Sequence, residues 1–380
     1  MAKSIVGITR VFMIIIGLWK LRLFQDPLKQ QTYQVYSIGI KTVLFAIGAS
    51  STFRFFQLLN EDNPNSTIVY SALTINILIY LMSASVIVFL KCGIPDVFAE
   101  ILLEETRALN SEDEEIRQCY LGQAGYYQFT SICQIFGAVS SAVVFVSLNV
   151  YNKANGFFQE QEVFMYQLWL PFDPDKHFVA VLLINFLVLF VAVSCNVASR
   201  VIIQTLIIFA ISQLRILQIL LRKVFSQDET QLKRLIRKHQ KLIRFVEFLN
   251  DSLKNLIWIE YMINTVSVAA GLLHIITAST LFERVYSSFH FVLLTVQVFV
   301  LAWSANEINI QSTKVAHAAF YSNWIDQTEQ TKKIIHIIIM RAQKPLVLKI
   351  GMFRPMNAES AVITMKGAYT YASVMLQKYS

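Results

Sequence analysis

Seven stretches of the chain are long and apolar enough to cross a lipid bilayer, and this constrains the fold more than any other feature of the sequence. They run approximately over Tyr36–Leu59, Ile68–Leu90, Gln123–Val150, His177–Lys223, Leu256–Phe282, Ser287–Gln311 and Glu359–Gln377. Composition agrees, because 55% of the 380 residues are hydrophobic and 15% are charged, against about 25% charged in soluble domains. We therefore predict an all-α membrane protein with seven transmembrane helices.

The fourth stretch, from about His177 to Lys223, is longer than one bilayer crossing requires. As a helix its roughly 46 residues extend about 70 Å, whereas the hydrocarbon layer is about 30 Å thick. One helix that leaves the membrane and continues into a cytoplasmic protein layer explains this length. Two spans with a break near Ser199 and Arg200 are the alternative, although no Gly or Pro marks a break there.

Positive charges are distributed unevenly between the segments that connect these stretches. If the N-terminus is cytoplasmic, the cytoplasmic segments hold 24 Lys and Arg and the extracellular segments hold 4. Because Lys and Arg accumulate in cytoplasmic loops, we expect a cytoplasmic N-terminus and an extracellular C-terminus. Asn65, in Asn65-Ser66-Thr67, then falls in the first extracellular loop and is a candidate glycosylation site.

Two segments, Thr230–Leu256 and Ala316–Arg341, have helical periodicity and are too polar to span. With the end of the fourth stretch they would form a cytoplasmic helical anchor domain, whose apolar faces need burial between subunits. Near the N-terminus a short apolar segment contains Arg10, which predicts a helix at the inner membrane surface. The expected divisions are 1–35 for this N-terminal part, 36–311 for transmembrane helices 1 to 6, 312–357 for the anchor helix and linker, and 358–380 for helix 7.

The segment Met340–Met356 carries the most specific motif of the sequence. It reads MRAQKPLVLKIGMFRPM and resembles the cytoplasmic linker before the last helix of insect odorant receptors. The matching residues are Arg341, Ala342, Gln343, Lys344, Pro345, Leu346, Gly351, Phe353, Pro355 and Met356. Leu168–Asp173 and His239 resemble two further family features, a W-x-P-F-D loop and a His before the fifth span. Thr370-Tyr371 followed by Gln377 is similar instead to the ending of gustatory receptors.

The resemblance implies a subunit of a tetrameric ligand-gated cation channel, located in the plasma membrane of sensory neurons. Its partners would be the shared odorant receptor co-receptor, membrane lipid and a small volatile ligand. The chain is short between the fourth and fifth spans, where the co-receptor is enlarged, so it resembles a ligand-tuned subunit. The last helix would line the pore, with Thr370, Val374, Gln377 and Lys378 on one stripe.

In the family the ligand lies in an apolar cavity in the outer half of the membrane. Aromatic side chains would stack on a small volatile, and Tyr or Ser would offer a hydrogen bond. The candidate ligand-binding residues on the corresponding spans are Leu73, Ile77, Tyr80, Phe136, Ser140, Val144, Leu183, Leu187, Phe190, Tyr286, Phe289 and His290.

Other classes of protein fit the sequence less well. A G-protein-coupled receptor would place its N-terminus outside, and a transporter would show internal repeats with broken helices. No metal or cofactor motif and no catalytic motif such as HExxH or GxSxG occurs, so neither an enzyme nor a cofactor is expected. The net charge of +8 is assigned to membrane topology, and no nucleic acid partner is predicted. A gustatory receptor channel of the same fold stays as the main alternative.

Overall fold

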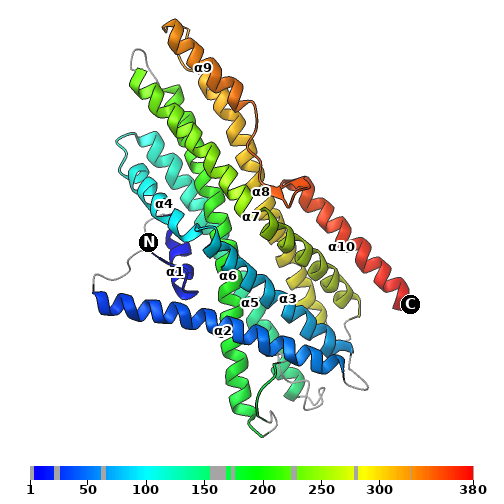
Figure 1. Ribbon diagram of the computed structural model, residues 1–380. Helices are drawn as coiled ribbons and strands as arrows, with labels where there is room; N and C mark the ends of the chain where they lie inside the picture. Colours follow the sequence, from blue (N-terminus) through cyan, green and yellow to red (C-terminus); the bar gives the residue numbers. More distant parts are fainter. Residues whose placement is uncertain are drawn as a thin grey trace.

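The computed structural model describes residues 4–20, 26–60, 66–154, 168–172, 176–223, 229–277, 281–325 and 327–379. It is an elongated bundle of helices (Figure 1). In chain order the elements are α1 Gly7–Ile15, α2 Pro27–Leu59, α3 Ser66–Lys91, α4 Ile94–Leu109, α5 Glu114–Ala154, α6 Phe178–Arg222, α7 Glu229–Thr277, α8 Leu281–Phe320, α9 Glu329–Ala342, β1 Lys349–Ile350, β2 Arg354–Pro355 and α10 Ala358–Tyr379.

Seven of these helices, α2, α3, α5, α6, α7, α8 and α10, correspond to the seven predicted spans. Each has at least 22 residues, which is enough to cross a hydrocarbon layer. Within the described residues, four segments are both long and strongly apolar, namely Pro27–Leu59, Val179–Arg222, Thr230–Leu273 and Ser287–Phe320. The predicted all-α membrane architecture is therefore confirmed.

Helix α6 runs through the centre of the bundle as one uninterrupted helix of 45 residues. The residues from Val201 to Leu214 are all buried, whichever way they point. A helix that is hydrophobic all round must be covered on every side, and α1, α5, α7 and α8 pack against it. The alternative of two spans with a break near Ser199 and Arg200 does not occur.

Helix α7 is longer than the sequence predicted. The amphipathic segment Thr230–Leu256 and the fifth span form the single helix α7 of 49 residues, because no Gly or Pro separates them. Conversely, the predicted helix Ala316–Arg341 is two helices. Helix α8 ends at Phe320 and α9 begins after Thr328, whose side chain accepts a hydrogen bond from the backbone N–H of Thr331 at 3.3 Å.

The N-terminal helix α1 packs one face against the bundle, while Arg10 and Val11 on its other side are exposed. Met13 and Thr9 are fully buried, and the Thr9 hydroxyl hydrogen-bonds to the hydroxyls of Tyr127 on α5 and Thr205 on α6. These bonds satisfy polar groups that are costly to bury alone. Helix α2 begins at Pro27, within the 1–35 segment, and the Asp26 side chain accepts from the backbone N–H of residue 28.

A short antiparallel strand pair interrupts the otherwise helical chain just before α10. Its turn needs Gly351, whose φ of +60° is the left-handed region that other residues rarely adopt. The pair is fixed to α7, since the Gly351 N–H donates to the Lys254 carbonyl and the Lys349 N–H donates to Asn250 Oδ1, both at 2.9 Å. The base of α10 is thereby attached to α7.

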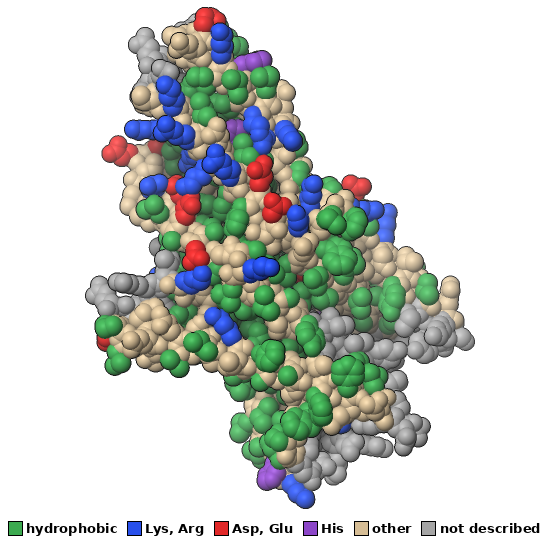
Figure 2. All heavy atoms as spheres, in the orientation of Figure 1, with side chains coloured by type: hydrophobic (Ala, Val, Ile, Leu, Met, Phe, Trp, Pro, Cys, Tyr) green, Lys and Arg blue, Asp and Glu red, His purple; other side chains and the backbone are tan. Residues whose placement is uncertain are grey.

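Charged side chains gather at one end of the molecule. Figure 2 shows Lys and Arg concentrated in the upper part, over α4, α9 and the first half of α7, whereas hydrophobic side chains dominate the lower part. Many large apolar side chains of the described residues are exposed, among them Phe45, Phe129 and Val179. Exposed apolar surface of this extent is expected where lipid is the solvent.

Candidate functional site

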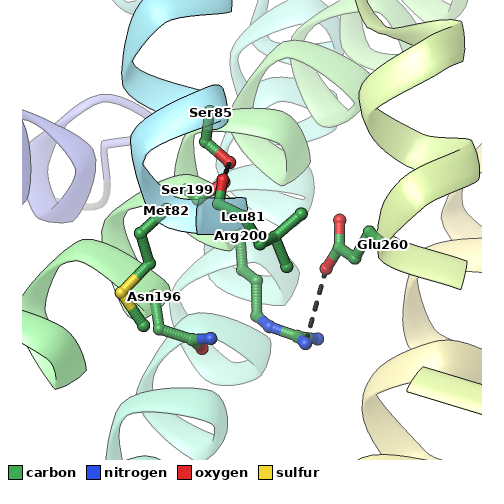
Figure 3. Close-up of a pocket in the computed structure, with 7 residues that line it drawn as sticks. All are labelled: Leu81, Met82, Ser85, Asn196, Ser199, Arg200 and Glu260. Atoms are coloured by element: carbon green, nitrogen blue, oxygen red, sulfur yellow. Dashed lines mark hydrogen bonds and ion pairs between the residues drawn. The ribbon is translucent and has the colours of Figure 1, made fainter. Parts of the chain in front are cut away.

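A buried ion pair joins α6 to α7 (Figure 3). Arg200 Nη2 lies 3.4 Å from Glu260 Oε1 and 3.4 Å from Asn264 Oδ1, and the two charged side chains are 12% and 7% exposed. Arg200 lies about 33 Å along α6, which is about one hydrocarbon thickness. A small cavity beside the pair has room for about one water molecule. It is lined by Leu81, Met82, Ser85, Asn196, Ser199, Arg200 and Glu260.

This polar cluster is only partly satisfied by protein groups. A strong charge-assisted hydrogen bond between nitrogen and oxygen measures about 2.7–2.9 Å, so the contact between Arg200 and Glu260 is long. Arg200 Nε has no hydrogen-bond partner among the described residues. A water in the adjacent cavity can hydrogen-bond to Arg200. The space is too small for an odorant, so we assign this cluster a structural role between helices.

The side chains predicted to bind ligand lie largely on the outer surface of the chain. Six of them are 39% to 71% exposed, namely Tyr80, Phe136, Leu183, Leu187, Phe190 and Phe289. On α6 the buried face carries Val181, Asn185 and Val188 instead. The stripe of Leu183, Leu187 and Phe190 therefore points away from the bundle. The structure does not bring these six side chains together into one cavity enclosed by this chain.

Two of the predicted ligand-binding residues, Ser140 and His290, lie where α5 and α8 meet. His290 on α8 is partly buried, and its Nδ1 atom is 3.1 Å from the hydroxyl of Ser141 on α5. Ser140, the predicted residue, bonds to the carbonyl of Gly137 in its own helix. One turn away, a Cβ added at Gly137 would lie 2.7 Å from Leu293 Cδ2. Gly137 therefore lets the Leu293 side chain of α8 pack directly against the backbone of α5.

Helix α10 is covered on one face only. Ala368 and Ala372 are buried against Val268 and Ala269 of α7, and Phe291 of α8, the neighbour of His290, packs on the same cluster. The residues predicted to line a pore lie on the exposed side of α10. They are Thr370, Val374 at 58% exposure, and Gln377.

Several predicted residues cannot be placed in the same way. Asn65 lies outside the described residues. Leu73 and Ile77 of α3, Val144 of α5, Tyr286 of α8 and Lys378 of α10 lie on described helices, but their side chains are outside the described part of the structure.

Comparison with known proteins decides between the sensory receptor classes that share this arrangement. A family model described as 7tm Odorant receptor matches residues 63–369, which is most of the chain. The chain belongs to this odorant receptor family. It is therefore a multi-pass membrane protein of a receptor family rather than of an enzyme family.

Individual odorant receptors match over shorter regions. Odorant receptor 30a of Drosophila melanogaster is 30% identical over 179 residues, which cover 46% of this chain and 48% of that protein. Odorant receptor 10 of Aedes albopictus is 26% identical over 152 residues, which cover 40% of each protein. The matched regions thus span less than half of the length of these relatives.

Solved structures extend the similarity of fold over nearly the whole chain. The insect olfactory receptor OR5 from Machilis hrabei in complex with eugenol superimposes with a TM-score of 0.79 at 17% sequence identity. The superposition covers 98% of this chain and 97% of that one. A second structure of the same receptor gives a TM-score of 0.77. The odorant receptor fold described above is thereby confirmed.

The sequence did not reveal the partners in the ion pair of Arg200 with Glu260 or in the contact of His290 with Ser141. From the sequence, Arg200 marked only the position of a possible break in the fourth stretch, and Glu260 was not singled out. The available signal was a cation and a carboxylate inside two apolar stretches, which need each other if both are buried. Ser141 was passed over for its neighbour Ser140, because sequence alone does not fix the rotation of an apolar helix.

Proposed function

We propose that this odorant receptor is the ligand-tuned subunit of a heterotetrameric, odorant-gated cation channel whose last helix lines the pore. The single observation that carries the proposal is the unequal coverage of α10. One face packs Ala368 and Ala372 against α7 and α8, and the other carries the exposed side chains of Thr370, Val374 and Gln377. Further copies of the fold around a shared axis would cover that face and enclose a water path.

The contact between α5 and α8 supports a ligand effect on this helix. His290 and Ser141 form a polar contact in an apolar setting, which suits recognition of a volatile that carries one hydrogen-bonding group. The next residue, Phe291, packs on the cluster that holds Ala368 and Ala372 of α10. A ligand that changes the spacing of α5 and α8 would therefore act on α10 through a single layer of side chains.

The proposed orientation has a cytoplasmic N-terminus and an extracellular C-terminus in the plasma membrane of a sensory neuron. The gathering of Lys and Arg at the end formed by α4, α9 and the start of α7 supports it. In this orientation α9 and the adjoining ends of α6, α7 and α8 form the cytoplasmic anchor domain. The exposed apolar side chains Ile337 and Met340 of α9 then lie available for contact with neighbouring subunits, the co-receptor among them.

The test is expression in oocytes with the co-receptor and recording of currents evoked by a panel of volatiles. We expect odorant-evoked cation currents that persist when G-protein signalling is blocked and that are absent when the co-receptor is omitted. Currents that vanish under G-protein blockade would contradict the channel assignment.

Substitution of Val374 tests the pore assignment separately. Val374→Ala should change the relative permeability to cations, because it removes apolar bulk from the exposed face of α10. Val179→Ala is the matched control, since Val179 is 69% exposed at the start of α6, away from α10. Identical permeability of Val374→Ala and wild type would remove Val374 from the pore.

A further inference from the structure

Lys366 places a positive charge on the uncovered face of α10. It lies four residues before Thr370 and eight before Val374, so the three side chains follow one stripe of the helix. Lys366 is exposed, whereas Ala361, on the face that packs against the bundle, is fully buried. The ammonium group is thus on the same side of the helix as the proposed pore residues.

The position of this charge along the helix requires an explanation. Lys366 follows the first residue of α10 by eight positions, about 12 Å, which places it within a membrane-spanning helix. An ammonium group in hydrocarbon is costly unless it reaches water or an opposite charge. Among the described residues no carboxylate lies within ion-pair distance of Lys366. The exposed position of Lys366 on the uncovered face of α10 leaves its ammonium group open to water, if that face lines an ion path.

We propose that Lys366 lines the ion path on the N-terminal side of Val374 and limits cation permeation by electrostatic repulsion. This subunit then conducts only in assemblies whose other subunits have no positively charged side chain at the same depth of the pore. This inference rests on the proposed pore function. It adds a selectivity-determining residue outside the predicted stripe of Thr370, Val374, Gln377 and Lys378. It also gives a physical reason for mixed assembly, because several copies of Lys366 around one path would repel cations together.

The size of the effect follows from Coulomb's law. A unit charge about 7 Å from a cation in water raises the energy of that cation enough to lower its local concentration about threefold. For a divalent cation the repulsion energy is twice as large, so its local concentration falls about sevenfold. Removing the charge should therefore favour Ca²⁺ over Na⁺ by about threefold, and reversing it should favour Ca²⁺ further.

The experiment measures the permeability ratio of Ca²⁺ to Na⁺ from reversal potentials of odorant-evoked currents, with the co-receptor present. Lys366→Gln and Lys366→Glu should raise the ratio in that order. Lys41→Gln is the matched control, because Lys41 lies within the span α2, where it hydrogen-bonds to Ser37, and not on α10. An unchanged ratio in both Lys366 variants would overturn the proposal.

A second measurement does not depend on current. The Lys366→Cys variant is labelled in membranes with a charged, water-soluble methanethiosulfonate reagent, and wild type sets the background from its own four cysteines. Labelling above background supports a water-lined position, and labelling equal to background overturns it. Absence of odorant-evoked current in wild type would refute the proposed function instead, and the labelling result would still decide whether Lys366 meets water.

Discussion

Removing the carboxylate of Glu260 should destabilise the receptor by several kcal/mol. The variant Glu260→Gln keeps the shape of the side chain but leaves the Arg200 guanidinium, which is 12% exposed, without its counter-charge. At the observed separation of 3.4 Å and an effective dielectric constant of about 20, the lost attraction is about 5 kcal/mol. Asn264 and a water in the adjacent cavity can recover part of it, so we expect a net loss of about 3 kcal/mol.

The assay is thermal unfolding of the purified receptor in lipid nanodiscs. A loss of about 3 kcal/mol should lower the melting temperature by about 4 °C in a chain of this length. Glu329→Gln is the matched control, since it removes the same group from an ion pair with Lys332 in which the Glu side chain is 79% exposed. Exposed pairs contribute about 0–1 kcal/mol, so this control should unfold close to wild type.

The double variant Arg200→Gln/Glu260→Gln tests the cause. It leaves no uncompensated charge and should be more stable than Glu260→Gln alone, although one residue more is changed. The reasoning fails if Glu260→Gln unfolds at the wild-type temperature. It also fails if the double variant is no more stable than the single one, because loss of packing rather than a stranded charge would then explain the result.

Three further predictions concern other parts of the fold. Burial holds the pKa of His239 at about 4, against 6.5 in the unfolded chain. The free energy of unfolding should therefore fall by about 2 kcal/mol between pH 7.5 and pH 5, because at pH 5 only the unfolded chain takes up the proton. Melting curves of His239→Gln at both pH values should lack this loss, and an equal loss of stability in the variant and the wild type would contradict the prediction. Gly351→Ala, at φ +60°, should cost about 1–2 kcal/mol in the same assay, whereas Gly39→Ala, with nothing within 4 Å of the added carbon, should cost nothing. Thr9→Val removes the buried hydroxyl that bonds to Tyr127 and Thr205 and should cost about 1–3 kcal/mol in the free energy of unfolding, measured by denaturation. An unchanged midpoint would contradict a stabilising role for these two hydrogen bonds.

The long elements of this fold are predictable from the sequence, because an apolar stretch of sufficient length has few alternatives in lipid. The length of α6 and the absence of Gly or Pro near Ser199 predicted its continuity correctly. The ends of α7 and α8 were harder to predict, since a helix does not stop where it leaves the membrane. The rotation of α5 and α6 about their axes could not be predicted. Phe136 and Leu183 were predicted to line a ligand cavity, yet both are exposed, because cavity-lining, core and lipid-facing side chains are equally apolar in membranes.

The attachment of the strand pair to α7 has a mechanical consequence. Two hydrogen bonds from residues 349 and 351 hold the chain immediately before α10, while the last helix extends 22 residues beyond them. That length is about 33 Å. If α10 tilts by only about 5° about these two hydrogen bonds, its far end moves by about 3 Å, roughly the diameter of a water molecule. The displacement is therefore greatest at the far end of α10 and smallest next to the strand pair.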